Sequence, residues 1–550
     1  MFENYETFTR EELKTLKKYV TSTTDSVFVL RNLPEVIKGA LFSRYSRSSL
    51  GLRSLLLKDF INNNEQAAFS DISGNYELSG SSDSEQSDQN QIVAVKKAQN
   101  FYDRILDGYG DDSIGELGGA HLAVEHISML AAKVIQDARI GGSPLEKSTR
   151  YIYFDQKHGG KYLFYRDPVL MTSAFRDLYI ETCDNLFDTY RLLIPPLTDL
   201  IRSGFPQDPN VSSFAYNAAL RAKVLDCLRG LLPASSLTNM GVFGNGRFFD
   251  SLIHKLHSHS LSELQEVGKS AHRELSKVIP SFVKRSSQET KYQADFAEFF
   301  SKTSEKLSQF SSQMNVLKTE SKEMVSLIDY DKDGGAKVAA SIMFAQGDNS
   351  LKDLENHMRS VPKEEVARLF STLCETRGNR RHKSPRALER AEFTFEIVAD
   401  FGIYRDLHRH RMLTQERQLL TCDLEYYVPK EIKGTAMEVP YREALESAQK
   451  AFDQMRHDLP EEAQYVVPMA YNIRWYFHVN LRSLQWMCEL RSGAAGHPMY
   501  RLVAQEMAKQ VIAVAPEFEP FFKFVDYEGY ELGRLEQEIR SEKKQKSRMS

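Results

Sequence analysis

The sequence predicts a tandem fold, in which two divergent copies of one unit are joined by a polar connector. Three observations lead to this prediction. A chain of 550 residues is too long for one small domain, so two or more domains are expected. A spacing between Pro and Asn-x-Arg occurs twice, and two polar, Ser- and Gln-rich stretches interrupt the ordered sequence. The interpretation of every other motif depends on this repeat.

The polar stretches divide the chain into segments. Residues 1–60 are expected to form a helical N-terminal extension, with an apolar-periodic stretch that opens at Leu33-Pro34-Glu35. Residues 61–91 contain no Lys or Arg and are rich in Asn, Ser, Gln, Asp and Glu, which predicts a disordered acidic insertion. The remaining expected segments are a first copy (93–285), a helical or flexible connector (286–326), a second copy (327–527) and a charged tail (528–550).

The repeat is clearest late in each copy. The first copy has Arg229 four residues before Pro233, and Asn245-Gly246-Arg247 begins twelve residues after that proline. The second copy has Gln464 four residues before Pro468, and Asn480-Leu481-Arg482 begins twelve residues after it. The shared spacing indicates that the two segments are divergent copies of one unit.

Composition and charge exclude several classes of protein. Hydrophobic residues make up 41% and charged residues 27% of the chain, as in soluble globular proteins. The net charge of -4 gives no overall attraction to nucleic acid or anionic membrane, and no apolar run is long enough to span a bilayer. The five scattered cysteines form no CxxC pair. This argues for a reducing, cytoplasmic compartment and against a structural zinc site, so no metal is expected.

In the first copy, Glu146-x-Ser148-x-Arg150 follows a Gly-Gly-Ser-Pro turn. On an extended stretch, side chains at alternate positions face the same way. That face would combine a carboxylate, a hydroxyl and a guanidinium, a set suited to a nucleoside monophosphate. The alternative, which the pattern alone favours, is a solvent-facing strand with a Glu–Arg pair.

In the second copy, Arg409-His410-Arg411 places two guanidiniums beside an imidazole. Such a group of cationic donors is hard to bury unless an anion or a polar ring system lies between them. The alternative is a solvated helix end, where Arg and His complement the helix dipole.

Together these motifs resemble the flavin-dependent thymidylate synthases, duplicated in tandem. That family carries Arg-His-Arg, seven residues and then Ser, within RHRxxSxNExSxRY. The second copy keeps Arg409-His410-Arg411, but Leu419 and Thr421 stand at the later Ser and Arg positions. The first copy keeps Glu146, Ser148 and Arg150, while its Arg-His-Arg positions have become about Ala138-Arg139-Ile140.

The losses are complementary elsewhere as well. The family's Arg four residues before the Pro is Arg229 in the first copy and Gln464 in the second. A later family Arg is Arg491 in the second copy and Leu256 in the first. The resemblance implies an α+β fold in which each copy has a mixed sheet and helices. It also implies composite sites built from both copies, in a homodimer that forms a pseudo-tetramer.

The resemblance further implies a methyltransferase reaction that converts dUMP to dTMP, with methylenetetrahydrofolate and NADPH as co-substrates and FAD as the cofactor. The residues implied to bind dUMP are Glu146, Ser148, Arg150, Arg229 and Arg491. Those implied to act in catalysis are Arg409, Arg491 and Ser148. Those implied to bind FAD are Arg409, His410, Arg411, Asn245, Arg247, Asn480 and Arg482.

Two other functions stay open. The departures at Leu419 and in the first copy fit a catalytically degenerate homologue that binds flavin or nucleotide without making dTMP. The basic stretch 377–383 and the basic tail would fit a nucleic-acid-binding protein, but near-neutral net charge and the lack of a recognisable module weigh against it.

Overall fold

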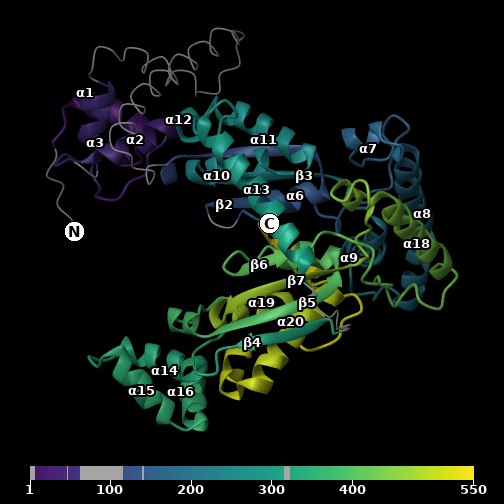
Figure 1. The fold of residues 1–550 in the computed structure, drawn as a ribbon. Coiled ribbons are helices and arrows are strands. Elements are labelled where there is room, and N and C mark those ends of the chain that lie inside the picture. The colour runs from purple at the N-terminus through teal and green to yellow at the C-terminus, as the bar shows by residue number, and fades with distance from the viewer. Residues whose placement is uncertain (1–6, 46–47, 62–114, 139–140, 315–322, 550) are drawn as a thin grey trace. The chain divides into compact units, whose positions relative to one another are not determined.

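The computed structural model describes residues 7–45, 48–61, 115–138, 141–314 and 323–549 (Figure 1). The insertion expected over 61–91 lies outside the described residues apart from Ile61, as do Arg139 and Ile140 and part of the connector. The chain forms two compact units. Unit 1 comprises residues 1–125, 134–146 and 239–316, and unit 2 comprises residues 126–133, 147–238 and 317–550. The first copy therefore contributes to both units.

Unit 1 contains a three-stranded sheet in the order β1-β3-β2. Strands β2 and β3 are antiparallel, with Gly142 opposite Gly244 and Glu146 opposite Met240. Strand β1 and helix α6 each have residues in both units. The strands are β1 (Gly119–Ser128), β2 (Gly142–Glu146) and β3 (Leu237–Asn245). The helices are α1 (Arg10–Tyr19), α2 (Glu35–Tyr45), α3 (Leu52–Leu55), a π-helical turn (Leu56–Ile61), α6 (Met129–Gln136), α10 (Gly246–His257), α11 (Ser262–Leu275), α12 (Pro280–Val283) and α13 (Lys291–Gln313).

Unit 2 contains a four-stranded antiparallel sheet in the order β4-β5-β7-β6. Strands β5 and β7 pair along their whole length, and alternate β5 side chains such as Phe393, Phe395 and Ile397 are buried. Helices α19 and α20 pack on this sheet (Figure 1). The strands are β4 (Val325–Tyr330), β5 (Glu392–Asp400), β6 (Thr414–Arg417) and β7 (Asn472–Asn480).

The helices of unit 2 come from both copies. Helix α8 of the first copy lies beside α18 of the second (Figure 1). The first-copy helices are α7 (Pro168–Thr172), α8 (Arg176–Gly204), α9 (Ser213–Leu228) and a 3-10 turn (Arg229–Leu231). The others are α14 (Gly334–Phe344), α15 (Leu351–Ser360), α16 (Lys363–Glu375), α17 (Phe401–Leu407), α18 (Glu438–Met455), α19 (Leu481–Arg491), α20 (Pro498–Val514) and α21 (Leu535–Met549), with 3-10 segments at Arg386–Arg390, Glu462–Val466 and Pro516–Phe522.

The tandem repeat is visible in the order of the strands. Apart from the edge strand β4, the order β5-β7-β6 repeats β1-β3-β2. In each copy the third strand ends on the asparagine of Asn-x-Arg, whose side chain caps the following helix. Asn245 Oδ1 accepts from the Phe248 N–H at 2.8 Å, and Asn480 Oδ1 accepts from the Ser483 N–H at 2.9 Å. The predicted α+β class with two copies is confirmed. The expected mixed sheet is corrected, because the described ladders are antiparallel.

Within unit 2 the two proline segments pair with each other, and we call this the proline junction (Gly230–Ser235 with Tyr465–Ala470). Its main-chain bonds are Ala234 N to Val467 O at 2.9 Å, Ser235 N to Tyr465 O at 3.0 Å, Met469 N to Leu232 O at 2.9 Å and Ala470 N to Gly230 O at 2.8 Å. Pro233 lies opposite Pro468 in an antiparallel arrangement. A Cβ on Gly230 would collide with the Tyr441 hydroxyl, so this close approach needs glycine.

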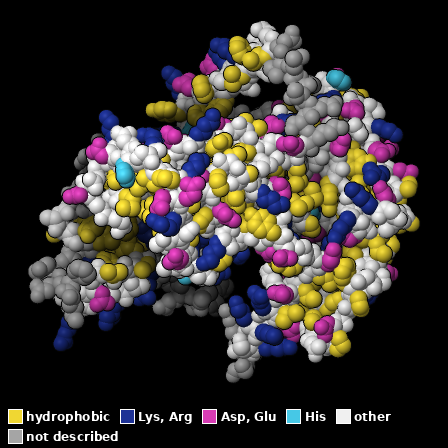
Figure 2. Space-filling model, turned by 90° about the horizontal axis from the view of Figure 1, so that it is seen from below, with side chains coloured by type: hydrophobic (Ala, Val, Ile, Leu, Met, Phe, Trp, Pro, Cys, Tyr) yellow, Lys and Arg dark blue, Asp and Glu magenta, His cyan; other side chains and the backbone are white. Residues whose placement is uncertain are grey.

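The surface carries charges of both signs. On the face shown in Figure 2, Lys and Arg side chains are interspersed with Asp and Glu, in agreement with the near-neutral net charge. No helix in the described part of the chain is both long and apolar enough to cross a membrane.

Candidate functional site

Arg150 of the first copy is held in a buried bidentate ion pair. Its Nε lies 2.5 Å from Asp226 Oδ1 and its Nη2 lies 2.6 Å from Asp226 Oδ2, while Nη1 donates to the Tyr500 hydroxyl at 3.1 Å. Burial opposes ionisation of Asp226, but Arg150 beside it overcomes this effect and holds the pKa of that carboxyl well below its usual range. Tyr500 belongs to the second copy, so residues from both copies meet here.

The prediction of an extended stretch around Arg150 is wrong. Strand β2 ends at Glu146, and Thr149–Tyr151 form a turn. Ser148 Oγ accepts from the Arg150 N–H at 3.2 Å, a local bond that competes with strand pairing. Glu146 instead accepts from Gln136 Nε2 at 3.0 Å in unit 1. The three side chains therefore do not share one face of a strand.

Arg229 lies at the end of α9 and is 3% exposed. Its Nη1 donates to Asp406 Oδ2 at 3.2 Å, but its Nη2 is buried without a hydrogen-bond partner. Burial alone would raise the pKa of Asp406. Arg229, Arg150 and Arg491 together hold it well below the usual range. The three arginines that the resemblance assigns to the dUMP phosphate thus act on one carboxylate.

Arg491 connects this group to the Arg-His-Arg triplet. Its Nε donates to His410 Nε2 at 2.9 Å, and its guanidinium carbon lies 5.6 Å from the centre of the Tyr500 ring. Burial, with Arg491 and Arg409 nearby, holds the pKa of His410 well below its usual range. His410 is therefore neutral and accepts a hydrogen bond through Nε2.

The other two members of the triplet differ in exposure. Arg409 follows the end of α17, is exposed, and has no hydrogen bond or ion pair with the residues the structure describes. Its position fits the alternative of a solvated helix end, whereas the His410–Arg491 contact does not. Arg411 is half-buried.

The Asn-x-Arg residues already have structural partners. Asn245 and Asn480 cap helices, as described above. Arg247 donates to Glu116 Oε1 at 2.8 Å in unit 1. Arg482 donates to the Ser384 carbonyl at 2.9 Å and to Glu389 Oε1 at 2.8 Å. Among the residues predicted to bind FAD, Arg409 and His410 remain suited to bind a ligand. Arg411 lies beside them.

The sequence reading missed four residues at this site: Asp226, Asp406, Tyr500 and His497. Asp226 lies in the last turn of α9, three residues before Arg229, which caps the helix. Residues three apart at a helix end lie on one side of it, and this spacing is a signal that could have found Asp226. Asp406 lies beside the triplet in the sequence, but nothing there pairs it with Arg229. Tyr500 lies 350 residues from Arg150, so only the fold brings them together.

His497 makes a bond through each ring nitrogen. Its Nδ1 accepts from the Met499 N–H at 3.2 Å, which caps α20, and its Nε2 lies 3.2 Å from the Asp226 carbonyl oxygen. A second proton would have to occupy Nδ1 and break the helix cap. Burial, with Arg229 nearby, lowers the pKa of His497 to about 3.

Replacing His497 by Asn should reduce the acid sensitivity of the protein. Below pH about 6.5, His497 is protonated in the unfolded chain but stays neutral in the folded protein. The free energy of unfolding therefore falls as pH falls from about 6.5 toward 3. Between pH 7 and pH 5 this costs about 2 kcal/mol. Urea unfolding at both pH values should show that the free energy of unfolding decreases less in His497→Asn than in the unaltered protein, by about that amount. Equal decreases in the two proteins would contradict the low pKa of His497.

Comparison with known proteins identifies the family. The sequence model described as "Thymidylate synthase complementing protein" matches residues 62–281 and 326–517. The chain belongs to the thymidylate synthase complementing protein family. The two matched stretches agree with the two copies seen in the strand order.

Three relatives place this family member more closely. It is 51% identical over 534 residues to a UPF0159 protein of Chlamydia muridarum, covering 97% of this chain and 98% of the relative. It is 52% identical over 542 residues to a UPF0159 protein of Chlamydia pneumoniae, covering 98% of each. A flavin-dependent thymidylate synthase of Clostridium tetani is 26% identical over 219 residues, which cover 35% of this chain but 83% of the relative. The low coverage of this chain and the high coverage of the relative are expected if this chain carries two copies of a unit that the relative has once.

Proposed function

We propose that the chain is an FAD-dependent thymidylate synthase that converts dUMP to dTMP with methylenetetrahydrofolate and NADPH. The observation that supports this function best is the grouping of three arginines: Arg229 pairs with Asp406, and the guanidinium carbons of Arg150 and Arg491 lie 5.5 and 5.6 Å from the centre of the Tyr500 ring. Arg150 and Arg229 come from the first copy and Arg491 from the second, within unit 2 of one chain. Each chain therefore builds its site from both copies.

The arginines suit the phosphate of dUMP. Rigid guanidinium donors bind phosphate in a fixed orientation, and the buried Nη2 of Arg229 still lacks an acceptor. Ser148 is half-buried, and because its oxygen accepts from the Arg150 N–H its hydroxyl proton can be donated to the substrate. Glu146, in unit 1, stays a candidate dUMP ligand by resemblance alone.

The Arg-His-Arg triplet suits the flavin side of the site. When bound, FAD would supply the hydride chemistry that no side chain of the protein can perform. The exposed guanidinium of Arg409 is available to polarise a uracil carbonyl and to stabilise negative charge that develops on it. The neutral His410, fixed by Arg491, can hold a polar ring edge without adding charge.

Only one of the two possible composite sites in a chain is complete. At the position equivalent to Arg229, Gln464 is buried and structural: its Oε1 accepts from the Leu420 N–H at 3.1 Å and its Nε2 donates to the Glu461 carbonyl at 3.0 Å. The complementary losses therefore predict one site per chain, and two in the proposed homodimer. Light scattering should give twice the chain mass of 63.0 kDa.

A second candidate function has a specific observation in its favour. Asp226 and Asp406 already neutralise Arg150 and Arg229, so a phosphate must compete with buried carboxylates. This arrangement, together with Leu419 at a family Ser position, fits a homologue that binds flavin or nucleotide without making dTMP.

The visible spectrum of the purified protein and tritium release from 5-tritiated dUMP separate the two. We expect a yellow protein, or one that turns yellow with added FAD, that releases tritium when the folate and NADPH are present. A colourless protein that takes up no FAD would contradict the thymidylate synthase function. A yellow protein that releases no tritium would support the second candidate.

A further inference from the structure

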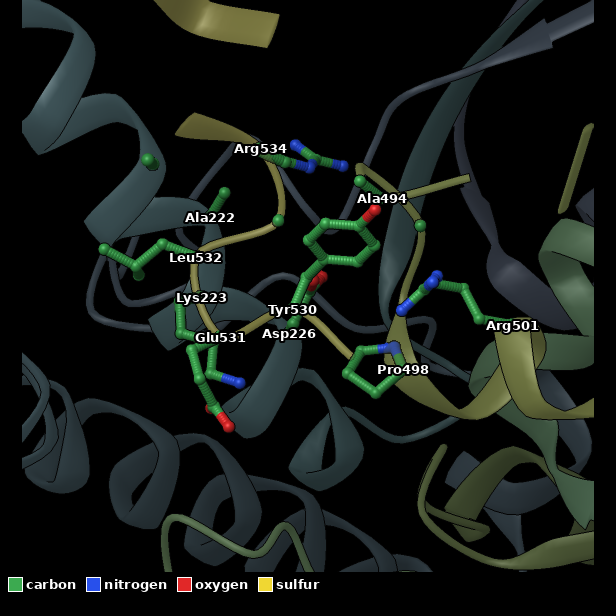
Figure 3. A pocket seen from close by; sticks show the side chains of 13 residues that line it. Ala222, Lys223, Asp226, Ala494, Pro498, Arg501, Tyr530, Glu531, Leu532 and Arg534 are labelled. Atoms are coloured by element: carbon green, nitrogen blue, oxygen red, sulfur yellow. The ribbon is translucent and has the colours of Figure 1, made fainter. Parts of the chain in front are cut away.

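A small cavity in unit 2 lies beside the Arg150–Asp226 pair. Its volume is about 20 Å³, room for about one water molecule. Figure 3 shows side chains that line it, among them Asp226 from α9, Arg501 from α20, and Tyr530 and Arg534 from the segment that precedes α21. That segment follows residue 517, where the match to the family ends, so no family motif assigns it a role.

Arg534 is a buried cation without an acidic partner. It is 7% exposed, and its Nε and Nη1 are buried with no hydrogen-bond partner. Within the described ranges, no carboxylate lies at ion-pair distance from its guanidinium. The Tyr151 ring lies 4.3 Å from its guanidinium carbon and supplies a cation–π contact, which is weaker than a carboxylate. Burying a charge in this way is costly unless an anion compensates it.

The surroundings of Arg534 make the excess of positive charge larger. Arg150 acts on Arg534 and lowers its pKa further after burial, whereas Asp226, which would compensate it, is already paired with Arg150. The group as a whole has four guanidiniums, on Arg150, Arg229, Arg491 and Arg534, against carboxylates on Asp226, Asp406 and Asp400. Burial raises the pKa of Asp400 to about 6, so of the three carboxylates Asp400 is the most readily protonated near neutral pH.

The segment before α21 is fastened at several points. Glu531 pairs with Lys430 at 2.5 Å, and the Glu528 carbonyl accepts from Arg501 Nη2 at 2.8 Å. A Cβ on Gly533 would collide with the Ala494 carbonyl oxygen, so the backbone passes close to the turn before α20. These contacts hold the Arg534 guanidinium at the cavity.

We propose that Arg534 is a phosphate ligand of the composite site, and that residues 526–534 form a strap that closes over a phosphate monoester bound between Arg534 and Arg150. This rests on the proposed function for the identity of the ligand as dUMP, but not for the need for an anion. A single buried water is the alternative occupant, and it would satisfy the two nitrogens without neutralising the charge. Because the cavity is too small for a phosphate, binding of the ligand would require residues 526–534 to move outward.

The test measures ligand affinity and thermal stability of full-length Arg534→Gln beside a matched control, Arg540→Gln. Arg540 lies on α21, is exposed and pairs with Glu536. Calorimetric titration uses dUMP and, separately, inorganic phosphate. We expect Arg534→Gln to weaken dUMP binding by about tenfold or more, because hydrogen bonds to charged groups have that effect, and Arg540→Gln to leave it unchanged. Without ligand, Arg534→Gln should unfold at the same or a higher temperature, because an uncompensated buried charge is removed.

Each other outcome is decisive. Unchanged dUMP affinity in Arg534→Gln, or a lower unfolding temperature without ligand, would overturn the inference and leave the proposed function standing. Arg534-dependent binding of inorganic phosphate without dUMP binding would support the phosphate site and contradict the proposed function. If the unaltered protein binds neither probe, both fail.

Discussion

Replacing Asp226 by Asn should lower the free energy of unfolding by about 3–5 kcal/mol. Asp226 and Arg150 are 10% and 8% exposed and share two short bonds, so the substitution leaves a buried guanidinium without its counter-charge. Removing one partner of a buried ion pair destabilises the fold far more than the intact pair stabilises it. The measurement is urea or guanidinium unfolding at pH 7.

The control is a second bidentate pair with similar geometry and much greater exposure. Arg456 binds Asp423 at 2.6 and 2.8 Å, with the two side chains 31% and 47% exposed. Asp423→Asn should cost less than about 1 kcal/mol, because water screens the pair and Arg456 keeps an ion pair with Asp453 at 3.4 Å. Equal losses in the two variants would show that burial does not govern the Asp226 effect.

Replacing Arg409 by Ala should lower the rate of dTMP formation by about 10²–10³-fold while changing the free energy of unfolding by less than about 0.5 kcal/mol. The proposed role of Arg409 is to stabilise charge on the uracil ring, and its exposed side chain has no bond to any described residue. Tritium release and urea unfolding measure the two effects. Arg386→Ala, at an exposed arginine paired with Glu389, should change neither.

Mixing Arg409→Ala with Ser148→Ala protein tests where the two halves of the site come from. Ser148 and Arg409 both lie in unit 2 of the same chain, so no activity should return in mixed dimers. Recovery of activity would mean that a site takes one half from each of two chains.

The repeat and the arginines could be predicted from sequence because each depends on short, contiguous spacing. The twelve-residue step from Pro to Asn-x-Arg reflects a turn, a strand and a helix cap, which are local features. The same locality limits what such spacing can predict. The FAD role implied for Asn480 stays a prediction, and its helix-capping bond is a structural role that its place between a strand and a helix also explains. The alternation around Ser148 predicts a strand, but the Ser148 hydroxyl accepts from the Arg150 N–H in the turn that follows β2.

The partners of the arginines could not be predicted, because the fold brings them from distant parts of the chain. Arg150 and Tyr500 are 350 residues apart, and Arg229 and Asp406 are 177 apart. The two compact units also do not follow the two copies, since the first copy leaves unit 1 after Glu146 and returns at Asn239. The expected segment boundaries within the chain stay predictions.

The proline junction implies an order of folding events during synthesis of this protein. At about 5–20 residues per second, the ribosome completes residues 465–470 roughly 10–50 s after residues 230–235. During that interval the first segment has main-chain donors and acceptors whose native partners do not yet exist. The first copy therefore cannot reach its final form as it emerges, and the Arg229 site is assembled only when translation of the second copy is nearly complete.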